Sequence, residues 1–172
     1  QFCGKPIDKT LFAKCVEKVK IAVEELEKQD VIITEFEALT ASAFLCYKEL
    51  QCDVVVLEVG LGGRLDATNV IAPPELSIIT KIGLDHTEYL GDTIEKITEE
   101  KCGIIKKGGA VVSFRNKAAE NIIKSEAEKN KAHLTVVEGA QKTESGFIYK
   151  GKEYLLSLKG NYQAENAAAV VE

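Results

Sequence analysis

Charged side chains and glycines gather in one short stretch near the first third of the chain. Three glycines separate Glu58 from Arg64, and Asp66 follows two residues later. Glycine allows positive φ angles and lets the backbone approach a ligand closely. The apolar run at residues 53–57 predicts a buried strand that delivers Glu58 at its carboxyl end, where ligands bind in open α/β sheets. The alternative is an ordinary turn with solvated charges, since short glycine motifs also occur without a ligand.

A second polar group follows the next apolar run. Residues 76–82 predict another strand, and its carboxyl end delivers Asp85 and His86. The alternation of strands with helices favours parallel pairing, which would bring Glu58 and His86 side by side at one edge of the sheet. A carboxylate and an imidazole placed there could bind a metal or act in acid–base chemistry. The alternative is a capping Asp85 and a His86 on the surface.

Two helix starts position further candidate side chains. Thr34 with Glu37 three residues later fits a capping box and predicts a helix that carries Phe36 near its start. On these residues alone, Thr34 is a simple cap and Phe36 a core side chain. Asp92 begins a second predicted helix, which runs through residues 94–105 and is ended by the glycines at 108 and 109. Lys101 lies near its last turn, where most lysines are solvated or interact with the helix dipole.

The remaining elements continue the alternation of helices and strands. An apolar stripe between residues 12 and 26 predicts a first helix, and residues 117–130 predict another, with Ala118, Ile122 and Ile123 facing inward. Residues 110–114 and 134–137 predict two more strands. Residues 147–156 predict an antiparallel hairpin that turns at 150–152, and a last helix begins near Gln163. This order favours an α/β fold with parallel strands.

The composition is that of a globular protein. The 172 residues are 45% hydrophobic and 28% charged, and the net charge of −5 argues against broad binding of nucleic acid or of an anionic membrane. No apolar stretch approaches the roughly 18 residues of a membrane helix, and the first residues do not resemble a signal peptide. The five cysteines include no C-x-x-C pair, which disfavours a disulfide framework or a zinc site. We therefore expect a cytoplasmic protein with reduced, mostly buried thiols.

Residues 58–69 resemble folylpolyglutamate synthase, an enzyme family that is often bifunctional with dihydrofolate synthase and belongs to the ATP-dependent Mur ligase superfamily. Four further stretches resemble the same family in the same order. They are residues 34–37, residues 83–86 with 90–91, residues 100–106, and residues 158–163 with 166–167. Cys102 stands where the family has alanine. The resemblance implies a central ATPase domain, with a mostly parallel sheet flanked by helices and a small antiparallel β extension.

The resemblance also implies roles for individual residues. Glu58 and His86 match magnesium ligands, although imidazole is not a preferred ligand of so hard a cation. Lys101 matches a lysine that is carbamylated in the superfamily, which would let it hold a second magnesium. His86 and Lys101 would therefore be the catalytic residues.

Substrate contacts are implied in the same way. Thr34, Phe36 and Asp66 match positions that contact the pterin, with Phe36 stacking on its ring and Asp66 accepting hydrogen bonds. Asn166 and Gln163 resemble the segment that contacts the adenine of ATP. The implied reaction uses ATP and Mg²⁺ to activate the carboxylate of a folate or of dihydropteroate as an acyl phosphate, which the amino group of L-glutamate then attacks.

The chain departs from the family in one respect. No G-x-x-x-x-G-K-[ST] phosphate loop occurs in it. We therefore expect residues 1–172 to be part of a central ATP-binding domain of a monomeric parent enzyme, with the phosphate loop upstream and a carboxyl-terminal domain outside the chain, and to be inactive alone. The alternatives are a Mur-type cell-wall amino-acid ligase and a non-catalytic module that binds a nucleotide or a pterin.

Overall fold

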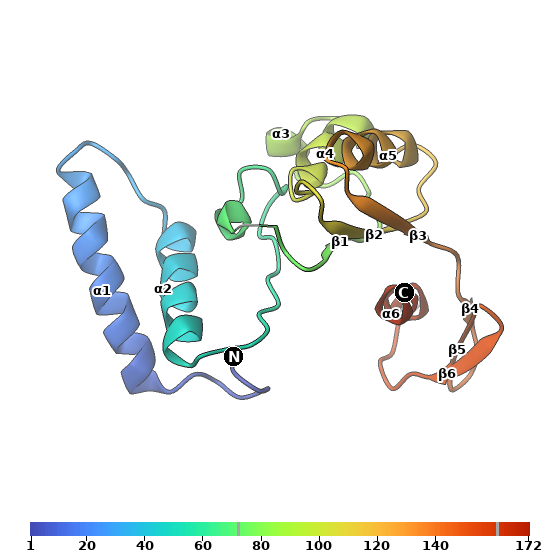
Figure 1. The fold of residues 1–172 in the computed structure, drawn as a ribbon, viewed down its shortest axis with the longest axis horizontal. Coiled ribbons are helices and arrows are strands. Elements are labelled where there is room, and N and C mark those ends of the chain that lie inside the picture. The colour runs from blue at the N-terminus through green and yellow to red at the C-terminus, as the bar shows by residue number, and fades with distance from the viewer. Residues whose placement is uncertain (72, 161) are drawn as a thin grey trace. The chain divides into compact units, whose positions relative to one another are not determined.

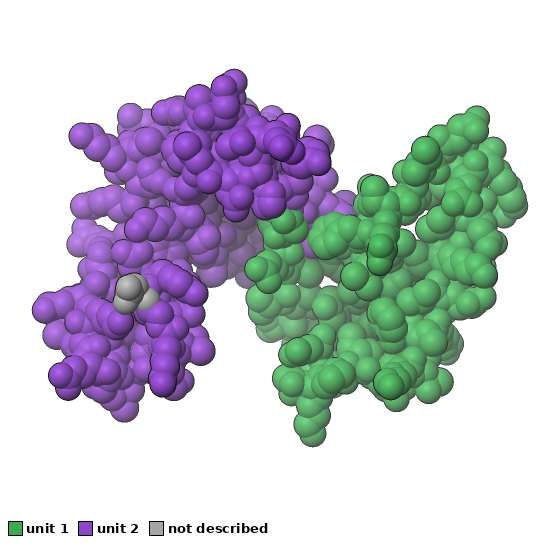
Figure 2. Space-filling model, turned by 180° about the vertical axis from the view of Figure 1, so that it is seen from behind, with its two compact units in different colours: residues 1–60 green, residues 61–172 purple. Residues whose placement is uncertain are grey.

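The chain is divided into two compact units. The structure, a computed structural model, describes residues 1–71, 73–160 and 162–172. Residues 1–60 form unit 1 and residues 61–172 form unit 2 (Figure 2).

Unit 1 is built on two helices that pack side by side, α1 (Lys9–Glu27) and α2 (Glu35–Glu49) (Figure 1). Cys15 of α1 and Cys46 of α2 are fully buried between them. An ion pair of 2.9 Å between Lys18 Nζ and a carboxylate oxygen of Glu49 also joins the helices. The expected start of α2 is confirmed, because Thr34 and the side chain of Glu37 form both hydrogen bonds of a capping box.

The predicted strand at residues 53–57 is wrong. A strand needs a hydrogen-bonded neighbour, and these residues pair with no strand in the described part of the chain. Val54 and Val56 are 81% and 90% exposed. The apolar β-branched run shows only that the segment suits a strand, whereas the partner decides whether one forms. Glu58 consequently follows an irregular segment and is exposed.

Unit 2 is organised around a parallel sheet in the order β1-β2-β3. Its strands are β1 (Ser77–Ile79), β2 (Ala110–Phe114) and β3 (His133–Val137). Val111 of β2 pairs with Ser77 on one side and with Leu134 on the other. Four of the five residues of β2 are buried, as expected for a central strand covered on both faces.

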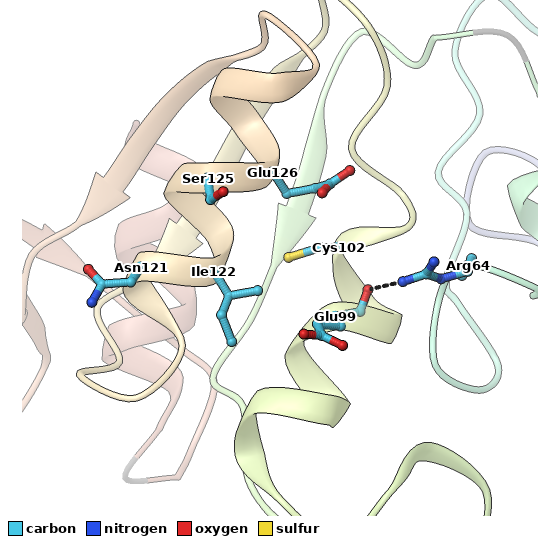
Figure 3. Close-up of a pocket in the computed structure, with 7 residues that line it drawn as sticks. All are labelled: Arg64, Glu99, Cys102, Asn121, Ile122, Ser125 and Glu126. Atoms are coloured by element: carbon cyan, nitrogen blue, oxygen red, sulfur yellow. Dashed lines mark hydrogen bonds between the residues drawn. The ribbon is translucent and has the colours of Figure 1, made fainter.

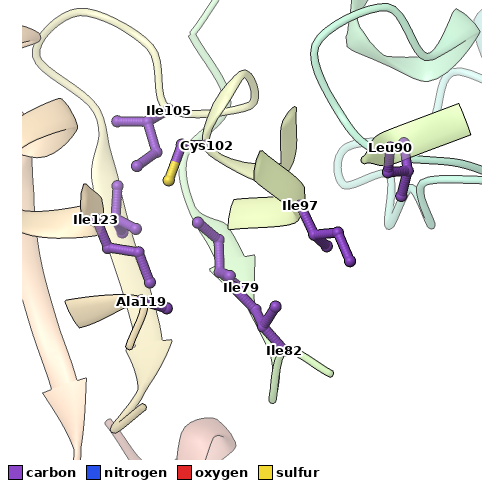
Figure 4. Packing of buried hydrophobic residues seen from close by; sticks show 9 residues of the cluster. Ile79, Ile82, Leu90, Ile97, Cys102, Ile105, Ala119 and Ile123 are labelled. Atoms are coloured by element: carbon purple, nitrogen blue, oxygen red, sulfur yellow. The ribbon is translucent and has the colours of Figure 1, made fainter. Parts of the chain in front are cut away.

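Helices α4 (Ile94–Cys102) and α5 (Glu120–Lys129) cover one face of this sheet (Figure 1). Ile79 and Val111 from the sheet pack there against Ile97 of α4 and Ile123 of α5, all at most 3% exposed. Figure 4 shows isoleucines of this cluster from α4, α5 and β1, together with Ile82 and Ile105 from the segments that follow β1 and α4. The short helix α3 (Thr87–Leu90) precedes α4 and contributes Leu90.

The other face of the sheet packs against α6 (Gln163–Val171) and a small antiparallel sheet. Val112 and Phe114 of β2 point to this side, because successive residues of a strand face opposite ways. The antiparallel strands are β4 (Gln141–Lys142), β5 (Gly146–Tyr149) and β6 (Lys152–Leu155). Lys150 and Gly151, with φ of 48° and 75°, form a two-residue turn, whereas the predicted turn extended to Lys152, which is the first residue of β6.

Three helix details differ from the expectation. Thr93 caps α4, since its Oγ1 accepts the Lys96 N–H at 3.3 Å, while Asp92 forms an ion pair with Lys96 Nζ. The helix ends at Cys102 and not at the glycines 108 and 109, because residue 103 is already its C-cap. The next helix begins at Glu120, and Ala119, not Ala118, is buried at its start.

The α/β fold class is confirmed: a parallel sheet flanked by helices, with a small antiparallel sheet beside it. Among the described residues, no helix is both long and apolar enough to cross a membrane.

Candidate functional site

The stretch of residues 61–70, called here the glycine loop, is closed on itself by Asp66. One carboxylate oxygen of Asp66 accepts the N–H of Leu61 at 3.0 Å, and the other accepts the N–H of Thr68 at 2.9 Å. The hydroxyl of Thr68 donates to Asp66 as well. Asp66 is only 9% exposed and caps the short 3₁₀ helix η1 (Ala67–Val70). The carboxylate therefore fixes the shape of the loop.

The glycines of this loop are explained by backbone conformation at Gly62 and by close packing at Gly63. Gly62 has a φ of +68°, a conformation that favours glycine. A Cβ on Gly63 would lie 2.8 Å from the carbonyl oxygen of Glu100 and 3.1 Å from the Cα of Lys101. The close approach that the sequence predicted for a ligand is, at Gly63, an approach to the end of α4.

Two side chains hold the loop against α4. The Arg64 backbone N–H donates to the Glu100 carbonyl at 2.9 Å, and Arg64 Nη2 donates to the Glu99 carbonyl at 3.2 Å (Figure 3). Arg64 Nε also lies 3.4 Å from a carboxylate oxygen of Glu100. Asn69 Nδ2 donates to the carbonyls of Arg64 and Gly103, both at 3.1 Å. The sequence indicated charge at Arg64 but gave no signal for the partners of Asn69.

Lys101 lies in the last turn of α4, as predicted, and is half-buried. It stands between residues 100 and 103, whose carbonyls accept hydrogen bonds from the glycine loop. The structure thus brings two of the resembling segments, residues 58–69 and 100–106, into direct contact through residues 63, 64 and 69. That contact was not predicted from the sequence.

His86 lies in the loop after β1 and is exposed. Its backbone is left-handed, with a φ of 48° and a ψ of 40°. Its N–H donates to Asp85 Oδ1 at 2.8 Å, and its Nε2 lies 3.8 Å from Asp85 Oδ2. A left-handed backbone in a non-glycine residue is uncommon and costs free energy. The local contact to Asp85 stabilises this conformation and keeps the imidazole at the surface.

The described residues include no group of three or more histidine, cysteine, aspartate or glutamate side chains able to hold a metal. Magnesium sites in phosphoryl-transfer enzymes use one or two protein ligands, several waters and the phosphates of the substrate. An exposed carboxylate such as Glu58 suits that pattern, because Mg²⁺ prefers oxygen ligands. The expected proximity of Glu58 and His86 stays a prediction, since the two residues belong to different units.

Thr34 and Phe36 lie at the start of α2 in unit 1. Thr34 Oγ1 accepts the N–H of Glu37 at 3.2 Å and donates to its carboxylate at 2.7 Å. The hydroxyl of Thr34, and its backbone N–H at 2.8 Å, donate to the Glu37 carboxylate and lower the pKa of Glu37, because they favour its charged form. Phe36 is 44% exposed, more than a core side chain would be. The aromatic ring is consequently available for stacking.

Gln163 and Asn166 lie in the first turns of α6, where Gln163 is half-buried and Asn166 is exposed. The Asn166 N–H donates to the Tyr162 carbonyl at 3.0 Å, a helical bond that leaves the side-chain amide to other partners. Residue 161, which is part of the resembling stretch 158–163, lies outside the described residues.

A pocket of about 370 Å³ opens beside the glycine loop, between α4 and α5 (Figure 3). Its lining is mostly polar and comprises Arg64, Glu99, Cys102, Asn121, Ile122, Ser125 and Glu126. Cys102 is 2% exposed, and burial raises the pKa of its thiol to about 12. A protonated thiol is a poor nucleophile, so Cys102 packs and does not react.

Comparison with known families identifies the fold. A family model described as the Mur ligase middle domain matches residues 9–172. The chain belongs to the Mur ligase middle-domain family. The family match includes all the candidate site residues, from Thr34 to Asn166. The resemblance inferred from the five ordered motifs is confirmed.

Individual Mur ligase relatives agree. The dihydrofolate synthase/folylpolyglutamate synthase of Bacillus subtilis is 40% identical over 181 residues, which cover 96% of this chain and 42% of the relative. A solved FPGS–AMPPCP–folate complex is 33% identical with a TM-score of 0.85, covering 97% of this chain and 44% of that one. Escherichia coli FolC, solved in complex with DHPP and ADP, is 31% identical with a TM-score of 0.81, covering 98% and 40%. The chain thus spans less than half the length of these relatives.

Proposed function

We propose that this chain is the central part of an ATP-dependent ligase that adds L-glutamate to a folate, and also to dihydropteroate in a bifunctional parent. The relative solved with AMPPCP and folate supports a nucleotide and a folate as ligands. The relative from B. subtilis carries both activities in its name. The free cysteines of the chain, three of them buried, agree with a reducing, cytoplasmic setting.

The observation that carries the proposal is the docking of the glycine loop onto the end of α4. It joins Asp66, the proposed pterin contact, to the helix turn that bears Lys101. Asp66 shapes the loop, and the loop meets the turn that bears Lys101, so one assembly links the proposed pterin contact to the proposed metal-binding lysine. A ligase needs the lysine near the phosphates and the reacting carboxylate, and the pterin contact at the other end of the same substrate.

The proposed reaction has two covalent steps. A carboxylate oxygen of the folate or dihydropteroate attacks the γ-phosphorus of ATP, and ADP leaves. The glutamate amino nitrogen then attacks the acyl carbon, phosphate leaves with that carboxylate oxygen, and the amine loses a proton as the amide forms. Glu58, His86 and a carbamylated Lys101 are the residues that would hold Mg²⁺, which neutralises phosphate charge when bound.

The pterin would be recognised by the remaining site residues. Phe36 offers an exposed ring for stacking. Asp66 offers carboxylate oxygens to the N–H groups of the pterin, and Thr34 lies two residues before Phe36. Gln163 and Asn166 supply amides for the adenine. In this proposal the Asp66 carboxylate has two tasks, to shape the glycine loop and to bind the pterin.

The test is glutamate addition by the full-length protein that contains this chain. ADP release and product mass are measured with ATP, Mg²⁺ and glutamate, and with either dihydropteroate or tetrahydrofolate. Turnover that Asp66→Ala abolishes is the expected result, and Glu144→Ala in an exposed loop is the control. Turnover only with a UDP-linked peptide would instead make the protein a cell-wall ligase, and no turnover with either kind of substrate would overturn the enzyme proposal.

A further inference from the structure

The end of α4 is capped by a distant segment of the chain. The last carbonyls of a helix have no partner within the helix. Here Arg64 Nη2 donates to the Glu99 carbonyl at 3.2 Å (Figure 3), and the Arg64 backbone N–H donates at 2.9 Å to the Glu100 carbonyl, which also accepts the Gly103 N–H at 3.2 Å. A guanidinium at this position also interacts favourably with the negative end of the helix dipole. The glycine loop is therefore a cap for α4 as well as a candidate ligand loop.

Asn69 makes a second attachment on the other side of Lys101. Its side-chain nitrogen donates to the Gly103 carbonyl at 3.1 Å and to the Arg64 carbonyl at 3.1 Å. Both amide hydrogens of Asn69 are thus used. The two attachments bracket Lys101, with Glu100 held on one side and Gly103 on the other.

The backbones of the two segments touch between these attachments. A Cβ on Gly63 would lie 3.0 Å from the Lys101 carbonyl oxygen and 3.1 Å from its Cα. A Cβ on Gly103 would overlap with Arg64. The position of the Lys101 backbone is therefore set by the glycine loop with little freedom to shift.

We propose that Arg64 and Asn69 are positioning residues that fix Lys101 for the ligation reaction. The inference rests on the proposed function, in which Lys101 carries the group that faces the phosphates. Displacement of a reacting group by about 1 Å can cost roughly 100-fold in rate. Asp66, the proposed pterin contact, shapes the same loop. The loop therefore links Asp66 to the backbone of Lys101.

The experiment compares Asn69→Ala and Arg64→Lys in the full-length ligase. Asn130→Ala is the matched control, because Asn130 Nδ2 also donates to a carbonyl, that of Glu126 at 2.9 Å, but on α5. We expect kcat to fall about 10- to 100-fold in Asn69→Ala with KM for ATP and glutamate within about threefold. Arg64→Lys keeps the positive charge but loses the planar guanidinium that donates to the Glu99 carbonyl. We therefore expect kcat to fall less in Arg64→Lys than in Asn69→Ala.

Hydrogen exchange of peptides covering residues 97–106 provides the second readout. Faster exchange there in Asn69→Ala, but not in Asn130→Ala, is expected. Equal kcat losses in Asn69→Ala and Asn130→Ala would show general destabilisation and overturn the inference, as would unchanged exchange. If the wild-type protein ligates no glutamate, the proposed function fails and so does the role at Lys101, while the exchange result still decides whether the loop holds the end of α4.

Discussion

Gly63 and Gly103 lie where the backbones of the glycine loop and of α4 touch. Sequence reasoning recognised the loop as a place where the backbone approaches something closely, but it could not identify what is approached. The partner of Gly63 is a helix end nearly forty residues further along the chain. The sequence predicted which residues belong to the loop. It could not predict the contacts of Arg64 and Asn69, because these depend on tertiary packing.

A methyl group at Gly63 should destabilise the protein. Gly63→Ala would place its Cβ 2.8 Å from the Glu100 carbonyl oxygen, so backbone must move. We expect a loss of about 1 to 3 kcal/mol in the free energy of unfolding, measured by urea denaturation. The control is Gly83→Ala, where a Cβ meets no atom within 4 Å. Equal stability of the two variants would contradict the packing described here.

Cys102 should make stability depend on pH in the alkaline range. Burial raises the pKa of its thiol to about 12 from a usual value of 9.0. Between those values the folded protein binds a proton that the unfolded chain has lost, so stability falls as pH rises above about 9. The stability of wild type should therefore fall more steeply than that of Cys102→Ala in urea denaturation between about pH 8 and about pH 11. A constant difference between the two across this range would contradict a buried, protonated thiol.

At the scale of elements, local capping signals predicted the start of α2 correctly and the start of α4 one residue too early. The start of α2 was predicted correctly because both partners of its capping box are local. The start of α4 was assigned to Asp92, since Asp92 and Thr93 are both good caps and only the geometry selects Thr93. The end of α4 was placed too late. The Gly103 N–H closes the helix onto the Glu100 carbonyl at 3.2 Å, and the glycine loop adds donors from a distant part of the chain that the sequence did not indicate.

The capping role of Thr34 can be separated from its proposed contact with the pterin. Thr34→Ala should lower the free energy of unfolding by about 1 kcal/mol, because the N–H of Glu37 loses its acceptor. Thr34→Ser keeps the hydroxyl and should keep the stability. Thr10→Ala, in the first turn of α1 where Asp8 is the cap, is the control. Equal losses in Thr34→Ser and Thr34→Ala would show that the methyl group, and not the cap, stabilises the helix.

The strands were predictable where their pairing is local or where burial on both faces leaves a long apolar run. The hairpin of β5 and β6 and the bounds of β2 were both correct. Residues 53–57 have the same apolar character as β2, yet they pair with no strand in the described residues. Composition alone cannot distinguish these cases, because pairing depends on a neighbour elsewhere in the chain.

For the whole molecule, the sequence predicted the α/β class and the family, and both are confirmed. The alternation of elements and the five ordered motifs carried these predictions. The assembly of the proposed metal site was not predictable to the same degree. Glu58 belongs to unit 1, whereas His86 and Lys101 belong to unit 2, and residue types alone do not fix how separate units combine.

The central claim is that the parent of this chain activates a carboxylate as an acyl phosphate. The most direct test supplies the full-length protein with ATP, Mg²⁺, glutamate and a folate substrate whose reacting carboxylate is labelled with ¹⁸O. Mass spectrometry of the products should find one ¹⁸O in the released phosphate and none in ADP. Label in AMP would demonstrate adenylation in place of phosphorylation, and phosphate without label, formed together with the glutamate amide, would contradict the acyl-phosphate mechanism.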